Sequence, residues 1–305
     1  MAQRYFLLGP TASGKTAVAL DLAERLNAEI LSLDSMLVYR GMDIGTAKPS
    51  AEEMAAVPHH LIDLVEPAEE FSVARYLEAA AAAEADVYTR GKKVLYVGGT
   101  TMWFKALVFG LLDIPDIEQA LQDELQQQWD QNGAAKLYTE LQQVDAAAAA
   151  RIHPNDERRV LRALGVWRAT GKALSDWQQQ WQPGNQLPEP AALLEWPREI
   201  LHQRVAQRFQ AMVEVGLLEE IAAIQSSGGF GRTAGKAIGY RQVLDHLEGK
   251  CSLAEGLQKA VTKTNVLIRR QMTWLRSFPD LLRIEMQQGE APSEVAARLA
   301  SAWHA

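Results

Sequence analysis

Apolar positions in the first hundred residues alternate between short, mostly continuous runs and stretches with helical character. The runs at residues 5–8, 28–33 and 93–97 each predict a strand buried within a sheet. Between them, residues 17–26 have helical spacing and the alanine-rich residues 72–90 predict a second helix. Strands that alternate with helices indicate an α/β fold with a parallel sheet.

Gln, Ala and Asp become frequent between residues 112 and 190, and this change predicts a helical insertion. Its expected parts are helices at 119–131 and 134–143, an alanine run at 144–152, a helix capped by 153–156, and a linker at 177–190. We expect a core domain made of residues 1–112 and 191–305, with an all-helical insertion domain at 113–190.

After the insertion, residues 193–196 predict a final strand, and a long helix follows from Pro197 to about residue 224. Its apolar stripe is formed by Leu201, Val205, Phe209 and Met212, with Arg204 and Arg208 beside it. Leu61 and Ile62 predict a further short strand. We interpret the preceding pair, His59 and His60, as structural because adjacent strand residues cannot face one metal ion.

Hydrophobic content, cysteine count and net charge exclude several classes of protein. The 305 residues are 48% hydrophobic, which allows a full core, and no apolar run approaches the roughly 20 residues of a membrane span. Residues 1–4 lead directly into the first strand, so we expect no signal peptide, no membrane and a cytoplasmic protein. One cysteine, Cys251, allows no internal disulfide. The net charge of −7 disfavours general coating of nucleic acid but permits a local basic groove.

A phosphate-loop motif lies between the first strand and the first helix. Its residues are Gly9, Pro10, Thr11, Ala12, Ser13, Gly14, Lys15 and Thr16. Glycines let successive N–H groups face one concavity at a helix N-terminus, where Lys15 adds a mobile ammonium. Thr16 would place its hydroxyl on a Mg²⁺ ion that bridges the phosphate oxygens. The flanking strand and helix disfavour the alternative, a glycine-rich turn that matches by accident.

Polar residues follow the next strands. Asp34 comes directly after residues 28–33, so it should face the ligand at the carboxyl edge of the sheet; the alternative is a cap for a helix at 36–40. After residues 93–97, two glycines and Thr100 stand where a motor ATPase would usually carry an acidic residue. The glycines allow close approach to the backbone, and Thr100 offers a hydroxyl.

Cations are segregated along this acidic chain. Residues 232–241 and 256–279 contain no acidic residue, and the outside of the helix after residue 156 carries four arginines. These cations are Arg158, Arg159, Arg162 and Arg168 in the insertion, and Lys236, Arg241, Lys259, Lys263, Arg269, Arg270 and Arg276 in the core. Together with Gln271, Thr273 and Trp274 they suit RNA phosphates and unstacked bases, although a solvated face would also explain them.

With these residues assembled, the chain closely resembles the tRNA dimethylallyltransferase (tRNA isopentenyltransferase) family in its bacterial form, over nearly its full length. The resemblance rests on residues 9–16, on Asp34-Ser35 followed by 38–49 (VYRGMDIGTAKP), and on 97–100 (VGGT), 151–156 (RIHPND), 238–240 (IGY) and 270–274 (RQMTW). It implies a P-loop NTPase-like parallel sheet flanked by helices, with an all-helical insertion domain that grips the anticodon stem.

The resemblance also implies a reaction. A dimethylallyl group would pass from dimethylallyl diphosphate to N6 of the adenosine 3′-adjacent to the anticodon in tRNA, releasing diphosphate. Residues 9–16 would bind the diphosphate with Mg²⁺ on Thr16. Asp34 matches the general base, Thr100 a position in the reaction channel, and Arg208 a clamp on the diphosphate. We expect a monomer without an obligate protein partner.

The tRNA contacts implied by the resemblance fall in four stretches. They are Asp34, Ser35, Met36 and Leu37; Arg158, Arg159, Val160, Leu161 and Arg162; Lys236, Ala237, Ile238, Gly239, Tyr240 and Arg241; and Arg269, Arg270, Gln271, Met272, Thr273, Trp274, Leu275 and Arg276. The chain departs from the family pattern at Thr101, Met102 and Trp103, at Asn265, and at Gln122 in the divergent insertion. None of these departures falls on Asp34, Thr100 or Arg208, the residues that the resemblance assigns to catalysis.

Three other functions share some of these features. A small-molecule kinase would also carry a phosphate loop and an aspartate after the second strand, but it would need ATP. An RNA-binding module gated by a nucleotide would not need Asp34 beside the phosphate nest. Prenylation of free adenine nucleotides is disfavoured by the helical insertion and the basic stretches.

Overall fold

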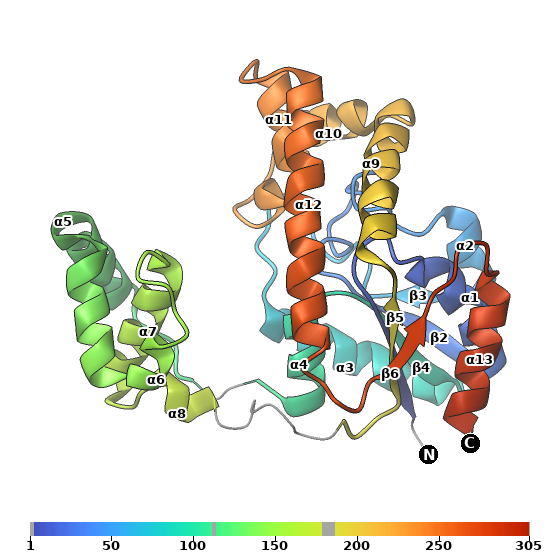
Figure 1. The fold of residues 1–305 in the computed structure, drawn as a ribbon, viewed down its shortest axis with the longest axis horizontal. Helices are drawn as coiled ribbons and strands as arrows, with labels where there is room; N and C mark the ends of the chain where they lie inside the picture. The colour runs from blue at the N-terminus through green and yellow to red at the C-terminus, as the bar shows by residue number, and fades with distance from the viewer. Residues whose placement is uncertain (1–2, 112–113, 179–186, 305) are drawn as a thin grey trace. The chain divides into compact units, whose positions relative to one another are not determined.

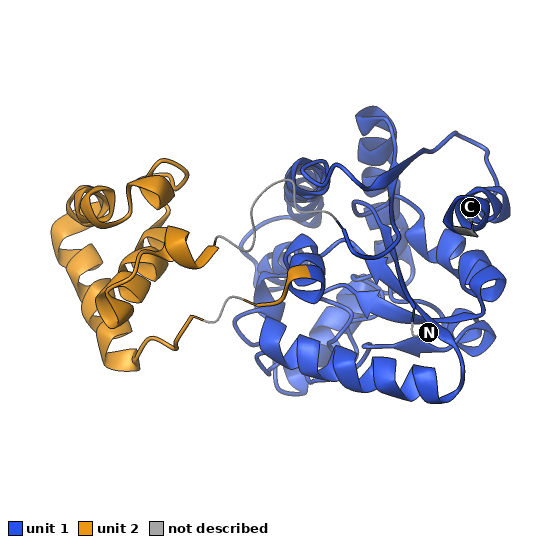
Figure 2. Cartoon of the chain, turned by 90° about the horizontal axis from the view of Figure 1, so that it is seen from below, with its two compact units in different colours: residues 1–108, 186–305 blue, residues 109–185 orange. Residues whose placement is uncertain are grey.

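The computed structural model describes residues 3–111, 114–178 and 187–304. The chain forms two compact units, residues 1–108 with 186–305 and residues 109–185 (Figure 2). The second unit occupies nearly the stretch expected for the insertion. Among the described residues, no helix is both long and apolar enough to cross a bilayer.

The first unit is built on a six-stranded sheet in the order β3-β2-β4-β1-β5-β6, and every pairing is parallel. Its strands are β1 (Arg4–Leu8), β2 (Ala28–Leu33), β3 (His59–His60), β4 (Lys93–Gly98), β5 (Ala191–Glu195) and β6 (Leu282–Glu285). Gly98 pairs with both Leu8 and Leu33, so the carboxyl ends of the three central strands are level. The predicted parallel α/β fold is confirmed.

Helices cover both faces of this sheet (Figure 1). The helices of the first unit are α1 (Lys15–Leu26), α2 (Ala51–Ala56), α3 (Val73–Thr89), α4 (Thr101–Phe109), α9 (Arg198–Glu214), α10 (Leu217–Ser226), α11 (Tyr240–Leu247), α12 (Leu253–Leu275) and α13 (Pro292–His304). On one face, α1 and α13 pack against Leu7, Leu95 and Leu194 of the strands. On the other face, Phe6 stacks on Tyr96 and meets the edge of Phe104 from α4.

Three expectations about elements were wrong. The sheet does not end at β5, because the short edge strand β6 follows much later, and its Arg283 and Glu285 interrupt any apolar run. The long helix expected up to residue 224 is two helices, α9 and α10, which separate at Gly216 with φ of 105°. The short strand contains His59 and His60, and Leu61 lies outside it because its φ is 64°.

The second unit is all-helical. It contains α5 (Gln119–Val144), α6 (Ala146–Ala149), α7 (Glu157–Thr170) and α8 (Leu174–Trp177). Gly133, with φ of 76° and ψ of 170°, interrupts α5 between the two helices that the sequence predicts. Asp156 caps α7 by accepting a hydrogen bond from the Arg159 N–H. Part of the linker expected at 177–190 lies outside the described residues.

Candidate active site

A pocket of about 460 Å³ opens at the carboxyl edge of the sheet. Its walls bring together the phosphate loop, the ends of β2 and β4, the segment after β2, and the inner face of α9. The lining includes Thr11, Lys15, Thr16, Ile30, Ser32, Asp34, Thr46, His59, Val97, Gly99, Arg204, Arg208 and Gln271. Residues far apart in sequence therefore share one cavity, as the open α/β topology predicts.

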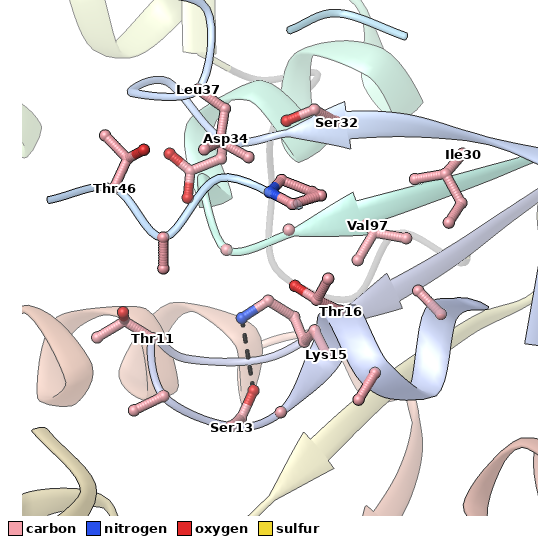
Figure 3. A pocket seen from close by; sticks show the side chains of 18 of the residues that line it. Thr11, Ser13, Lys15, Thr16, Ile30, Ser32, Asp34, Leu37, Thr46 and Val97 are labelled. Atoms are coloured by element: carbon pink, nitrogen blue, oxygen red, sulfur yellow. Dashed lines mark hydrogen bonds between the residues drawn. The ribbon is translucent and has the colours of Figure 1, made fainter. Parts of the chain in front are cut away.

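The phosphate loop forms one wall of this pocket (Figure 3). Ala12 and Gly14 have φ of 64° and 83°, and this left-handed backbone turns the chain into α1 at Lys15. The Lys15 ammonium donates to the carbonyl oxygens of Gly9, at 3.0 Å, and Pro10, at 2.7 Å. Burial lowers the pKa of Lys15 to about 8, with Asp34 opposing and Arg208 adding to the effect. The N–H groups at the start of α1 and this cation together favour an anion.

Two side chains on and just before α9 brace the phosphate loop. The indole N–H of Trp196 donates to the Ser13 carbonyl oxygen at 2.9 Å, and Arg204 donates to that of Ala12 at 3.4 Å. The Arg204 guanidinium also lies 3.8 Å from the centre of the Trp196 ring. The helical pattern predicts Arg204 only as a cation on the face of a helix. The role of Trp196 could not be predicted, because no local pattern links residue 196 to residue 13.

Asp34 lies on the opposite wall of the pocket, across from Lys15 (Figure 3). Residues 35–38 form turns and not a helix, so the alternative of a helix cap at 36–40 is wrong. Instead, Asp34 Oδ1 accepts a hydrogen bond from the Met36 N–H at 2.9 Å. This bond fixes the side chain locally and leaves the other carboxylate oxygen for a ligand.

Thr100 holds the turn that carries Asp34. Its hydroxyl oxygen accepts a hydrogen bond from the Ser35 N–H at 3.0 Å, and its own N–H donates to the Leu33 carbonyl oxygen at 3.2 Å. The preceding glycine is required by close packing, since a Cβ on Gly98 would lie 2.1 Å from that same carbonyl oxygen. The close approach predicted for the two glycines is therefore confirmed.

Arg208 and the loop after β2 close the pocket. The Arg208 guanidinium donates to the Thr46 carbonyl oxygen at 3.1 Å. Burial lowers the pKa of Arg208, and the nearby Asp34 carboxylate opposes that shift. A guanidinium remains charged despite such a shift. This half-buried cation therefore acts on both the Asp34 carboxylate and Lys15 of the phosphate loop.

Glu220 organises the loop that carries Thr46, and sequence analysis missed it. Its carboxylate accepts hydrogen bonds from the N–H groups of Asp43 at 2.9 Å, Ile44 at 2.6 Å and Gly45 at 3.2 Å, and from the Tyr240 hydroxyl at 2.5 Å. Burial, and then the bond to this carboxylate, raise the pKa of the Tyr240 phenol. A Cβ on Gly45 would lie 2.4 Å from the Tyr240 ring, so the ring and the loop backbone touch.

The stretches expected to contact tRNA are only partly exposed. Exposed members include Arg158, Arg159, Arg162, Lys236, Arg269, Arg270, Thr273, Trp274 and Arg276. Five members have buried side chains that pack within the protein, namely Val160, Ala237, Tyr240, Met272 and Leu275, and Gly239 is buried as well. A contiguous helix or loop segment always includes an inward face, and in these stretches the exposed members are the ones whose side chains are available to RNA. Contact between these stretches and tRNA stays a prediction.

Arg168 and the adjacent histidines make contacts within the protein. Arg168, expected among the outward cations of the insertion, pairs with Glu140 at 2.8 Å inside the second unit. The adjacent histidines bond separately, His60 with Glu29 at 2.6 Å and His59 with the Val57 carbonyl oxygen at 2.7 Å. No group of three or more His, Cys, Asp or Glu residues in the described part of the chain could hold a metal ion.

A phosphate loop that opens α1 after β1, with a carboxylate at the end of β2, defines an α/β protein that handles a phosphorylated ligand. Residues 37–278 match the family model described as IPP transferase, and residues 2–69 match one described as isopentenyl transferase. The chain belongs to the IPP transferase family.

Three solved structures are similar to this chain along most of its length. A full-length tRNA isopentenylpyrophosphate transferase from Bacillus halodurans is 34% identical, with a TM-score of 0.71 and coverage of 100% of this chain and 97% of that one. The tRNA delta(2)-isopentenylpyrophosphate transferase from Staphylococcus epidermidis is 28% identical, with a TM-score of 0.68 and coverage of 99% and 100%. A eukaryotic dimethylallyltransferase acting on tRNA is 27% identical, with a TM-score of 0.76 and coverage of 93% and 74%.

Proposed function

We propose that this protein transfers a dimethylallyl group from dimethylallyl diphosphate to N6 of the adenosine 3′-adjacent to the anticodon in tRNA, and releases diphosphate. The observation that carries the proposal is the pairing of two unlike walls in one pocket, a cationic phosphate loop and, across from it, the Asp34 carboxylate. Family membership and the tRNA-modifying relatives support the same reaction.

The phosphate loop would bind the diphosphate of the donor. When the allylic C1–O bond breaks, negative charge develops on the departing diphosphate, and N–H groups and cations already in place stabilise it. Lys15 and Arg208 are half-buried cations that line the pocket at this position. Because both side chains are partly withdrawn from water, their interaction with a diphosphate is stronger than that of fully exposed cations.

Asp34 would act on the acceptor. The exocyclic N6 of adenine is a weak nucleophile, and its attack on the allylic carbon requires that a proton leave the nitrogen. The Asp34 oxygen not held by Met36 is the acceptor for that proton, while Thr100 keeps the Asp34–Ser35 turn in place. The adenosine must leave the anticodon-loop stack to reach this carboxylate.

Mg²⁺ fits this site as an ion held mainly by the donor. Magnesium usually binds one or two protein oxygens together with substrate phosphates and water, and it does not need an all-protein cage. Thr16 presents a hydroxyl to the pocket beside Lys15, and Asp34 presents a carboxylate from the other wall. The ion would neutralise part of the charge on the diphosphate. Thr16 is the protein ligand that we propose for the Mg²⁺ ion.

The anticodon stem-loop would be held by the exposed cations of three of the four tRNA stretches, those at 158–162, 236–241 and 269–276. Within the second unit, Arg158 and Arg162 lie four residues apart on α7 and are exposed, whereas Arg168 is paired with Glu140. Replacing Arg158 and Arg162 by Ala should lower the slope of log binding against log salt by about 1 to 2, as expected for two lost phosphate contacts. An unchanged slope would assign these arginines to a solvated face.

One assay separates this function from a kinase. The protein is incubated with an anticodon stem-loop that carries consecutive adenosines, Mg²⁺ and labelled dimethylallyl diphosphate, or with labelled ATP in a parallel reaction. We expect the prenyl label to enter RNA without ATP. Phosphate transfer from ATP, with no prenyl transfer, would instead support the small-molecule kinase. A cytoplasmic location and a monomeric state remain predictions.

A further inference from the structure

Gln271 lies on the cation-rich helix α12, yet both ends of its amide bond to the protein backbone. Its Oε1 accepts a hydrogen bond from the Thr11 N–H at 3.1 Å, and its Nε2 donates to the Gly99 carbonyl oxygen at 2.9 Å. Thr11 belongs to the phosphate loop, and Gly99 follows β4. One side chain therefore joins three elements that are distant in sequence.

The glycine at position 99 is what allows this junction. A Cβ at Gly99 would lie 2.6 Å from the Gln271 Nε2 and 2.8 Å from the Gly9 carbonyl oxygen. The first distance is shorter than any ordinary contact, so a side chain here would displace the amide. The phosphate loop, the strand end and the helix are thus packed as closely as their backbones permit.

The phosphate loop needs such support because part of its backbone is unfavourable. Ala12 has φ of 64°, a left-handed conformation that costs a non-glycine residue about 1 kcal/mol or more and persists only where its surroundings hold it. Trp196 and Arg204 hold the loop through the carbonyl oxygens of Ser13 and Ala12. Gln271 holds it through an N–H group, and it alone among these three braces lies on α12.

We infer that Gln271 is a positioning residue for the diphosphate-binding loop and not a contact for RNA. This inference rests on the proposed function for the identity of the ligand. It reassigns one member of the stretch 269–276. Two exposed cations of that stretch, Arg269 and Arg270, immediately precede Gln271 in the chain. The helix proposed to bind RNA thereby also fixes the shape of the site that binds the donor.

The test compares Gln271→Ala and Gln271→Met with Gln258→Ala, an exposed glutamine elsewhere on α12. Calorimetry with inorganic pyrophosphate measures the loop directly, and binding of an anticodon stem-loop without donor measures the RNA surface. Loss of two hydrogen bonds should weaken pyrophosphate binding about 10-fold in both Gln271 variants. The KM for dimethylallyl diphosphate should rise with it, while stem-loop affinity stays unchanged and Gln258→Ala alters neither quantity.

Two results would overturn the inference. Weaker stem-loop binding with unchanged pyrophosphate binding would make Gln271 an RNA contact, and no change in either would make it dispensable. Gln271→Met keeps most of the side-chain volume, so it decides the question if Gln271→Ala does not fold. If the proposed function is wrong, the wild-type protein transfers no prenyl group to RNA. The difference in pyrophosphate binding between the wild type and the Gln271 variants would still be measurable, so the two failures can be told apart.

Discussion

The two walls of the pocket carry charge in different ways. On the wall of residues 9–16, positive charge comes from backbone N–H groups at the start of a helix and from Lys15, so it is spread over the whole loop. On the wall of residues 34–48, the proposed chemistry depends on Asp34, the carboxylate of this segment that lines the pocket. A spread-out cationic surface suits an extended anion, whereas one fixed carboxylate suits the transfer of one proton. The wall of residues 34–48 should therefore be far more sensitive to a single substitution.

Asp34→Ala tests that difference most severely. Removing the proposed proton acceptor should lower the rate of the chemical step by about 10²- to 10⁴-fold, the usual contribution of a positioned general base. Stem-loop and pyrophosphate binding should stay close to wild type. Single-turnover kinetics with saturating donor measure the step, and Asp21→Asn on α1, outside the pocket, is the control. Normal turnover would mean that N6 loses its proton by another route.

Arg208→Ala probes the cation that faces both walls. Loss of a charged donor should weaken binding of the diphosphate about 10- to 100-fold, because hydrogen bonds between charged groups contribute more free energy than hydrogen bonds between neutral groups. The effect should appear in the KM for dimethylallyl diphosphate and in the inhibition constant of pyrophosphate. Arg198→Ala removes an exposed arginine at the start of the same helix α9 and should change neither. Equal effects of the two substitutions would contradict the assignment.

The two walls also differ in what the sequence could predict. Short motifs predicted the phosphate loop, Asp34 and Thr100, because each lies where a strand ends and the chemistry follows from local backbone geometry. The braces could not be found in this way. Trp196 reaches Ser13, and Glu220 reaches Asp43, over more than 170 residues of chain. Such contacts depend on how the helices after β5 return to the sheet, and local periodicity contains no information about that path.

Burial explains the remaining differences between sequence and structure. The basic stretches were predicted from composition, which counts every residue in a segment, whereas an RNA surface uses only the outward side chains. Arg168 and Tyr240 carry polar groups, but Glu140 and Glu220 use those groups within the protein. Their acidic partners are remote in sequence, so neither pairing has a local signal. Assigning such residues correctly requires the packed structure.

Glu220→Gln tests the brace on the wall of residues 34–48. The Glu220 carboxylate accepts four hydrogen bonds through its two oxygens. In glutamine one of these oxygens is replaced by an NH₂ group, which cannot accept a hydrogen bond, so some of the donors would lose their acceptor. We expect a loss of about 1–3 kcal/mol in unfolding free energy and a several-fold lower kcat/KM, since the Thr46 carbonyl would no longer fix Arg208. Denaturant unfolding and steady-state kinetics measure both, with the exposed neighbour Glu219→Gln as control. A variant as stable and active as wild type would show that the loop holds its own shape.

The pH dependence of Lys15 is a graded effect, and it tests whether the phosphate-loop wall can lose one of its charges without a substitution. Because burial lowers its pKa to about 8, the ammonium is protonated at neutral pH and loses its proton as the pH rises through that value. If only the protonated form binds well, pyrophosphate affinity relative to that of Lys15→Met should fall by up to about 10-fold between roughly pH 7 and pH 9. Binding should also take up a proton above pH 8, because a bound anion raises the pKa of the lysine.

Calorimetry in two buffers of different ionisation enthalpy measures that proton uptake together with the affinity. Lys15→Met, which has no titrating group, should bind pyrophosphate more weakly at every pH and show no proton uptake near pH 8. Pyrophosphate itself becomes more negative as the pH rises, which would strengthen binding to a fixed cation, so the two contributions have opposite signs. Affinity that rises with pH as strongly in the wild type as in Lys15→Met would show that the backbone N–H groups dominate this wall and that the lysine charge adds little.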